Sequence, residues 1–190
     1  MVVERMDRQW CLFVDRDGVI NRRIVDGYVR EWGDFEWLPG AKRALGILRA
    51  WAPQLVVVTN QQGVGKGLMA SADVAMIHDQ MRSELAESGV SIDGFQVCPH
   101  LAASECRCRK PRPGLILDWL HAHSGSQPAL SVMCGDSRSD LELADNVAAV
   151  TGGCAGIQIG EPTGVSAYAS YDTLWDFAAA VEHAIQEQVS

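Results

Sequence analysis

Two patterns of apolar positions alternate along this chain: short, largely apolar runs, and longer segments with an apolar residue at every third or fourth position. The runs are typical of strands buried on both faces of a parallel sheet, and they occupy residues 11–14, 55–58, 95–97, 130–134 and 156–159. The periodic segments are typical of one face of a helix, and they lie within residues 41–51, 74–85, 116–120, 141–144 and 175–185. The alternation predicts an α/β protein with three α/β/α layers, a central parallel sheet and right-handed crossovers.

Local signals mark where the predicted helices begin and end. We expect Pro39-Gly40 to open the first helix and Pro53 to end it. Ser71 and Asp172 are the expected N-caps of the second and the last helix, and Pro113 suits the first turn of the third. The glycine-rich segment 61–67 is expected to be a loop.

Polar residues stand directly after three of the predicted strands. Asp15 and Asp17 follow the first strand, Thr59 and Asn60 end the second, and Asp136 follows the fourth. Side chains alternate in an extended chain, so Asp15 and Asp17 should point the same way. Open α/β sheets bind ligands at the carboxyl ends of their strands. We therefore expect these residues to meet in one site.

The chemistry available to this set is hydrolysis of a phosphate ester. An ionised Asp15 can attack phosphorus and form an aspartyl-phosphate, and Asp17 can protonate the leaving oxygen and later activate water. Asp15 and Asp136 offer the hard oxygen ligands that Mg²⁺ prefers. Lys110, before the third helix, would neutralise the phosphoryl oxygens, and Thr59 would donate a hydrogen bond to them. Each residue alone has an ordinary structural explanation, and it is their joint order that points to a site.

A second cluster of ligand-type residues lies between the third strand and the third helix. Its members are Cys98, His100, Cys106 and Cys108. Three sulfur ligands and one nitrogen ligand are the set of a closed, structural Zn²⁺ site. We expect zinc to stabilise the loop 98–108 and so to position the residues that follow it, Arg109 and Lys110.

Length and charge narrow the setting. The chain has 190 residues and a formal net charge of −8, which disfavours binding to nucleic acid because that depends on Lys and Arg. No apolar run is long enough to cross a bilayer, and residues 1–10 carry charges in place of an apolar signal core. We expect one domain, residues 1–190, in a cytoplasmic monomer that does not bind membranes.

The segments inserted after the first two strands bear on how open the site is. Residues 17–39 and 59–110 leave no room for a cap domain, which needs about 50 residues or more in addition to the helix and the loop already predicted there. We therefore expect no separate cap domain. The site should be bordered by loops, and arginines near it are candidates for a second anionic group of the substrate: Arg22, Arg23, Arg109 and Arg112.

The motifs D-R-D-G-V-I-N, D-G-Y-V, T-N-Q-Q-G and C-P-H followed by C-x-C-R-K-P-x-P-G carry a family resemblance. With G-D-x-x-x-D they are similar to the motifs of the haloacid dehalogenase (HAD) superfamily, over residues 11–148. More narrowly they resemble the bacterial D-glycero-D-manno-heptose 1,7-bisphosphate 7-phosphatases and the histidinol-phosphate phosphatases. The resemblance implies a Rossmann-like HAD fold and a Mg²⁺-dependent phosphatase.

The same resemblance implies a role for each matching residue. Asp15 would be the nucleophile and Asp17 the acid/base. Thr59 and Lys110 would bind phosphate, Asn60 would shape the phosphate loop, and Arg109 would contact the substrate. Mg²⁺ would be held by Asp15, the Asp17 carbonyl and Asp136.

Features of the loops divide between the two branches. Ser137, where heptose phosphatases often carry Lys, and the five residues between His100 and Cys106 favour the histidinol-phosphate branch. The Gly27-Tyr28 and Pro113-Gly114 pairs favour the heptose branch. We expect a small phosphorylated sugar as substrate, with removal of the 7-phosphate of the heptose bisphosphate, and keep histidinol phosphate as the alternative. A phospho-acceptor signalling domain is the alternative outside enzymes, but it needs neither a second acid nor a zinc loop.

Four histidines stand on or beside predicted helices without an evident partner. They are His78, His121, His123 and His183. We expect all of them at the surface or at its boundary.

Overall fold

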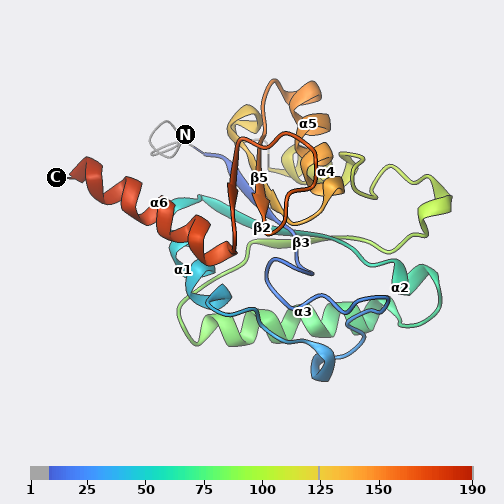
Figure 1. Ribbon diagram of the computed structural model, residues 1–190. Coiled ribbons are helices and arrows are strands. Elements are labelled where there is room, and N and C mark those ends of the chain that lie inside the picture. Colours follow the sequence, from blue (N-terminus) through green and yellow to red (C-terminus); the bar gives the residue numbers. More distant parts are fainter. Residues whose placement is uncertain (1–8, 124, 190) are drawn as a thin grey trace.

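A computed structural model describes residues 9–123 and 125–189 of the protein (Figure 1). The expectation that residues 1–10 carry no signal sequence falls mostly on residues 1–8, which lie outside the described part. One sheet of six parallel strands runs through the centre in the order β3-β2-β1-β4-β5-β6. The strands are β1 (Cys11–Val14), β2 (Gln54–Asn60), β3 (Gly94–Cys98), β4 (Val132–Gly135), β5 (Ala155–Ile159) and β6 (Ala169–Tyr171).

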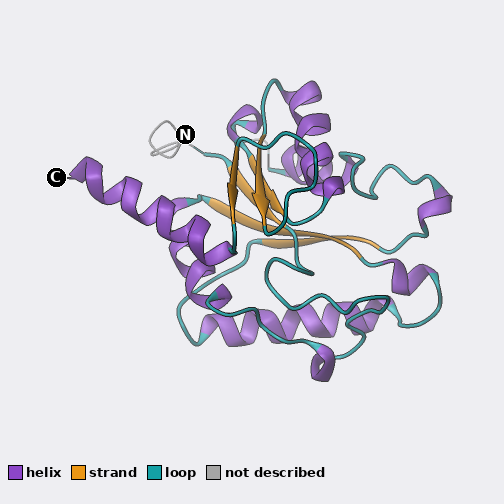
Figure 2. Cartoon of the chain, viewed as in Figure 1, coloured by secondary structure: helices purple, strands orange, loops and turns teal. Residues whose placement is uncertain are grey.

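Helices cover both faces of the sheet (Figure 2). They are α1 (Ala41–Trp51), α2 (Gln62–Gly65), α3 (Ser71–Ala86), α4 (Gly114–Ala122), α5 (Arg138–Thr151) and α6 (Leu174–Val189). Short 3₁₀ helices lie at Trp32–Asp34, Ala102–Ser104 and Pro128–Leu130. In the described part of the chain, no helix is long and apolar enough to span a membrane.

The alternation of side chains in β1 shows how the layers form. Leu12 and Val14 point into a core shared with α1, α3 and α6, whereas Cys11 and Phe13 point into a second core shared with α4 and α5. All four side chains are fully buried. The continuous apolar run therefore marks a strand covered on both faces, and the predicted three-layer α/β/α fold is confirmed.

Several local predictions need correction. Segment 61–67 contains the short helix α2 rather than only loop. The N-cap of α3 is Ala70 rather than Ser71, which is the first residue of the helix. The Asp73 carboxylate stabilises this first turn by accepting the Ala70 amide hydrogen bond at 2.7 Å. The last helix is capped by Thr173 rather than Asp172, because the Asp176 amide donates to Thr173 Oγ1 at 3.2 Å.

The strand order brings the predicted site residues to one edge. β1 lies between β2 and β4. The chain passes from β1 to β2 and β3 on one side and returns to β4 on the other, and this reversal of strand order opens a crevice at the carboxyl end of β1. In the described residues, the segments that border this crevice are loops and short helices, as expected for a HAD fold without a separate cap domain. The edge strand β6 was not predicted, because its three residues, Ala-Ser-Tyr, carry no strong apolar signal.

Candidate active site

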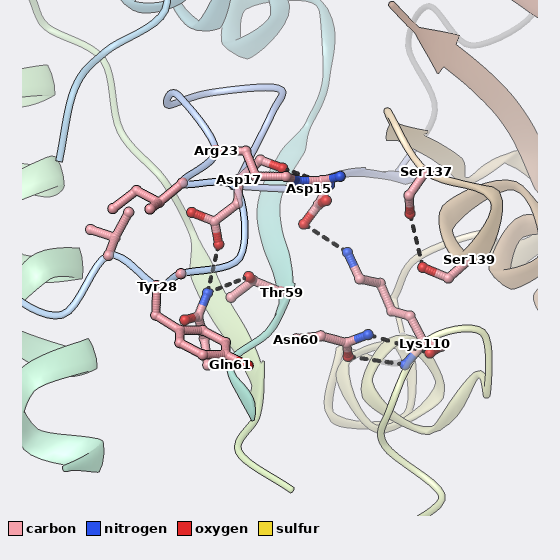
Figure 3. A pocket seen from close by; sticks show the side chains of 13 residues that line it. Asp15, Asp17, Arg23, Tyr28, Thr59, Asn60, Gln61, Lys110, Ser137 and Ser139 are labelled. Carbon is pink, nitrogen blue, oxygen red and sulfur yellow. Dashed lines mark hydrogen bonds and ion pairs between the residues drawn. The ribbon is translucent and has the colours of Figure 1, made fainter. Parts of the chain in front are cut away.

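An open cavity of about 280 Å³ lies at the carboxyl ends of β1 and β2. Figure 3 shows the side chains that line it. Five of the predicted site residues are among them: Asp15, Asp17, Thr59, Asn60 and Lys110. The cavity also takes in residues from the loop after β1 and from the start of α5, including Arg23, Tyr28, Ser137 and Ser139. The structure therefore brings most of the predicted set together.

Asp15 and Lys110 meet at the wall of the cavity, where both side chains are almost fully buried. The Lys110 ammonium lies 2.7 Å from Asp15 Oδ1 and 2.7 Å from Asp140 Oδ1, and it donates a hydrogen bond to the Val58 carbonyl at 3.0 Å. The side chains of Lys110, Asp15 and Asp140 are 3%, 7% and 0% exposed. One buried amine thus pairs with two buried carboxylates that reach it from different elements.

Asp17 is held by a polar network of its own. Arg16 Nη2 donates to both Asp17 carboxylate oxygens at 2.9 Å, and the side-chain amides of Asn21 and Gln61 donate to them at 2.9 and 2.8 Å. Arg16 is fully buried, and its Nη1 donates to His78 Nε2 at 3.3 Å. Burial by itself would raise the pKa of Asp17, but the charge of Arg16 and these hydrogen bonds lower it. Asp17 therefore stands as a carboxylate.

Residues at the end of β2 make hydrogen bonds to Asp17 and to the backbone of Lys110. The Gln61 side-chain amide donates to Thr59 Oγ1 as well as to Asp17, at 2.8 Å in each case (Figure 3). Asn60 accepts the Lys110 amide hydrogen bond at 3.1 Å and donates to the Lys110 carbonyl at 3.3 Å. Asn60 thus fixes the backbone from which the Lys110 side chain extends, and Gln61 fixes the distance between Thr59 and Asp17.

Three carboxylates gather where β1 and β4 end. One oxygen from each of Asp15, Asp136 and Asp140 lies within 4.8 Å of the others. Gly18 permits this approach, since a Cβ on it would lie 1.9 Å from Asp136 Oδ2, and its φ of +99° suits glycine. These are the hard oxygen donors that fit Mg²⁺. Asp140 is the least available, because it is paired with Lys110 and accepts the Ser137 amide hydrogen bond at 3.0 Å.

The charges of this cluster are not balanced. Burial raises the pKa of Asp15 to about 7, with Asp140 adding to the rise and Lys110 opposing it. Burial raises the pKa of Asp136 to about 6, with Arg23 opposing the rise and Asp140 adding to it. Burial would lower the pKa of Lys110, but its two carboxylate partners raise it, so the amine stays charged. The excess of negative charge favours binding of a further cation.

The predicted arginines are spread over different places. Arg23 lines the cavity and binds Asp136 at 2.7 Å. Arg22 instead pairs with Glu36 at the surface, at 2.8 Å. Arg109 lies in a neighbouring hollow that it shares with Lys110 and Arg112, and it is not among the residues that line the cavity.

The cysteine cluster forms as expected. The three Sγ atoms of Cys98, Cys106 and Cys108 lie 3.4 to 3.6 Å apart, and His100 Nδ1 lies 3.1 Å from Cys108 Sγ and 3.7 Å from Cys98 Sγ. Sulfur ligands of a tetrahedral zinc ion, each bound at about 2.3 Å, lie about 3.7 Å apart. None of these three cysteines forms a disulfide bond. The donor set and its spacing therefore fit Zn²⁺.

The expectation that His78 lies at the surface or at its boundary is wrong. Its side chain is buried, and its ring stacks on Phe95 with 4.1 Å between the centroids. Burial, and then the charge of Arg16, lowers the pKa of His78 to about 3, so the ring is neutral. The signal was present in the sequence, because His78 falls on the same helical stripe as Ile77 and Met81.

Known proteins are similar to this chain over nearly its whole length. The chain is 63% identical over 189 residues to the D-glycero-alpha-D-manno-heptose-1,7-bisphosphate 7-phosphatase of Mycobacterium tuberculosis (strain ATCC 25618 / H37Rv), which covers 99% of this chain and 100% of that protein. It is 35% identical over 188 residues to the D-glycero-beta-D-manno-heptose-1,7-bisphosphate 7-phosphatase of Escherichia coli (strain K12), with 94% of each chain covered. No family model matches the chain.

A solved structure is similar over nearly the whole chain. The crystal structure of D,D-heptose 1,7-bisphosphate phosphatase from B. bronchiseptica, complexed with magnesium and phosphate, has a TM-score of 0.81 and 30% sequence identity, and the match covers 94% of this chain and 99% of that chain. The fold and the relatives define a phosphatase of the HAD superfamily. Within it, the chain belongs to the family of the D-glycero-D-manno-heptose 1,7-bisphosphate 7-phosphatases. The expected family is thus confirmed, and the histidinol-phosphate branch is not favoured.

Proposed function

We propose that this protein removes the 7-phosphate of D-glycero-α-D-manno-heptose 1,7-bisphosphate through an aspartyl-phosphate. The observation that carries this proposal is the placement of Asp15 beside the buried Lys110 ammonium, with Asp17 on the same cavity wall. The relative that is 63% identical is named for the α anomer, and this favours the α over the β anomer as substrate.

In the first half of the reaction, an Asp15 carboxylate oxygen attacks phosphorus. The bond between phosphorus and the C7 oxygen breaks, and Asp17 supplies the proton that this oxygen needs. Lys110 and the Thr59 hydroxyl lie where they can bind the phosphoryl oxygens. Asp17 is a carboxylate before substrate binds. The approach of an anionic phosphate raises its pKa, and Asp17 then takes up from solvent the proton that it passes to the C7 oxygen.

In the second half, water attacks the aspartyl-phosphate. Asp17 accepts the proton of this water, the bond between phosphorus and Asp15 breaks, and inorganic phosphate leaves. The hydrogen bonds from Arg16, Asn21 and Gln61 hold Asp17 in place while it exchanges its proton. Once phosphate has left, Asp17 releases this proton to solvent, so that Asp15 and Asp17 both return to their starting state.

We propose that Mg²⁺ is the catalytic metal and that Asp15, Asp136 and the Asp17 carbonyl hold it. When bound, it neutralises the phosphoryl oxygens and so allows one anion to attack another. The oxygen donors and the unbalanced negative charge of the cluster support this assignment, as does the magnesium in the structure from B. bronchiseptica.

We propose that Zn²⁺ binds Cys98, His100, Cys106 and Cys108 as a structural ion. These ligands leave no open coordination position for a substrate. The site would hold the segment that leads directly to Arg109, which we propose contacts the substrate from the hollow beside Lys110. Metal analysis of the purified protein should find about one zinc ion per chain.

A substrate panel tests the proposed function. With Mg²⁺ present, kcat/KM should be highest for the α anomer of the heptose bisphosphate, lower for the β anomer, and lowest for histidinol phosphate and unrelated sugar phosphates. Asp15→Asn should abolish turnover while leaving the circular dichroism spectrum unchanged. A preference for histidinol phosphate would refute the proposed substrate, and a long-lived phospho-Asp15 without turnover would favour the signalling alternative.

We propose a cytoplasmic monomer as the working form. The cysteines of the zinc cluster form no disulfide bonds, which suits a reducing compartment. Light scattering after gel filtration should give the mass of one chain, 20.7 kDa.

A further inference from the structure

Arg23 binds the same oxygen atoms that the catalytic metal would bind. Its Nη2 donates to the Asp17 carbonyl at 3.0 Å and to Asp136 Oδ1 at 2.7 Å. Both oxygens belong to the proposed Mg²⁺ ligands. A guanidinium and a divalent cation cannot share them, because two cations at such distances repel each other strongly.

The Arg23 side chain can leave this position at low cost. It extends from the loop after β1 and is 49% exposed, whereas Asp136 is 17% exposed. An ion pair that is half exposed to solvent is a weak contact. Arg23 lines the cavity and Asp136 does not, so movement of the guanidinium would open Asp136 to the cavity.

The cavity offers few positive groups for a substrate with two phosphates. Of the described residues that line it, the cationic ones are Arg23 and Lys110. Lys110 is 3% exposed and already pairs with Asp140 and with Asp15, the proposed nucleophile, so its charge is placed at the reacting phosphate. A second phosphate needs another cation, and a guanidinium can bind it through two parallel hydrogen bonds.

We propose that Arg23 exchanges partners during the catalytic cycle. Its guanidinium holds Asp136 and the Asp17 carbonyl in the metal-free protein, leaves them when the divalent cation binds, and then binds the phosphate of the substrate that does not react. This inference rests on the proposed function. It makes Arg23 both a competitor of Mg²⁺ and a determinant of the preference for a bisphosphate.

A direct titration of Mg²⁺ tests the competition. Calorimetry on the wild type, Arg23→Ala and Arg22→Ala, without substrate, should show roughly tenfold tighter Mg²⁺ binding by Arg23→Ala, since a hydrogen-bonded charged competitor is lost. Arg22→Ala is the matched control. It removes the same charge at the neighbouring position, and the Arg22 guanidinium pairs with Glu36 at the surface rather than with the proposed metal ligands. Equal affinities in the wild type and Arg23→Ala overturn the inference alone. No Mg²⁺ binding by any of them overturns the proposed function as well.

Steady-state kinetics at saturating Mg²⁺ test the second partner. Arg23→Ala should raise KM for the heptose 1,7-bisphosphate roughly tenfold and leave KM for heptose 7-phosphate, which lacks the second phosphate, nearly unchanged. Arg23→Lys should recover part of the loss, because it keeps the charge. An equal rise of KM for both substrates would show that Arg23 does not bind the second phosphate.

Discussion

Lys110 is the residue whose removal has the most predictable cost. Its ammonium lies 2.7 Å from both Asp15 and Asp140, and none of the three side chains is more than 7% exposed. Lys110→Met keeps most of the volume of the side chain and removes the charge. Two carboxylates then remain buried with no neutralising partner.

The expected loss follows from this burial. Removing one partner of a buried ion pair costs about 3–5 kcal/mol, because the other charge stays buried and unpaired. For a urea dependence of about 2 kcal/mol per M, the midpoint of unfolding should fall by about 1.5–2.5 M. The loss should be smaller at acid pH, because Lys110 opposes the rise in the pKa of Asp15, and a carboxyl with a raised folded-state pKa destabilises the fold only as pH rises.

Urea unfolding of the metal-free protein, followed by tryptophan fluorescence, provides the assay. Lys42→Met is the matched control, since Lys42 pairs with Glu84 and the two side chains are 39% and 32% exposed, a pair worth at most about 1 kcal/mol. Added Mg²⁺ should raise the midpoint of Lys110→Met more than that of the wild type, because the bound ion neutralises carboxylates that have lost their ammonium partner. Equal midpoints for Lys110→Met and Lys42→Met would refute the view that Lys110 neutralises a buried carboxylate pair.

Three further predictions concern the turn, the zinc loop and the buried histidine. Gly18→Ala places a Cβ 1.9 Å from Asp136 Oδ2, so turnover should fall at least tenfold. Gly67→Ala is the control, because Gly67 also has a positive φ but a Cβ there would have no atom within 4 Å, and this variant should keep its activity. Similar activities of the two variants would contradict the steric argument. Cys108→Ala, or zinc removal by a chelator, should lower kcat/KM by misplacing the cations after the loop, and zinc added back should restore the chelated wild type but not the variant. Between about pH 6.5 and 3 the unfolded state binds one more proton at His78, so stability should fall with decreasing pH by up to about 1.4 kcal/mol per unit from this group. In His78→Gln that contribution should vanish, and parallel stability curves for wild type and variant would exclude it.

The sequence alone determined the class of fold, the position of Asp15 and Asp17 at the end of a strand, and the members of the cysteine and histidine cluster. A continuous apolar run such as 11–14 reports burial on both faces, and Asp15 and Asp17 stand at its end whatever the rest of the chain does. The spacing of Cys98, His100, Cys106 and Cys108 likewise lies within one short segment. These features are local, so the order of residues along the chain carries them.

Only the tertiary structure decided which of these residues touch one another. Arg23 and Asp136 are 113 residues apart in the chain and 2.7 Å apart in the fold, and no periodicity connects them. The hydrogen bond between Arg16 and His78 and the edge position of β6 also depend on packing between distant elements. A local pattern shows how much of a segment is buried, whereas the strand order and the pairing of charges decide what it is buried against.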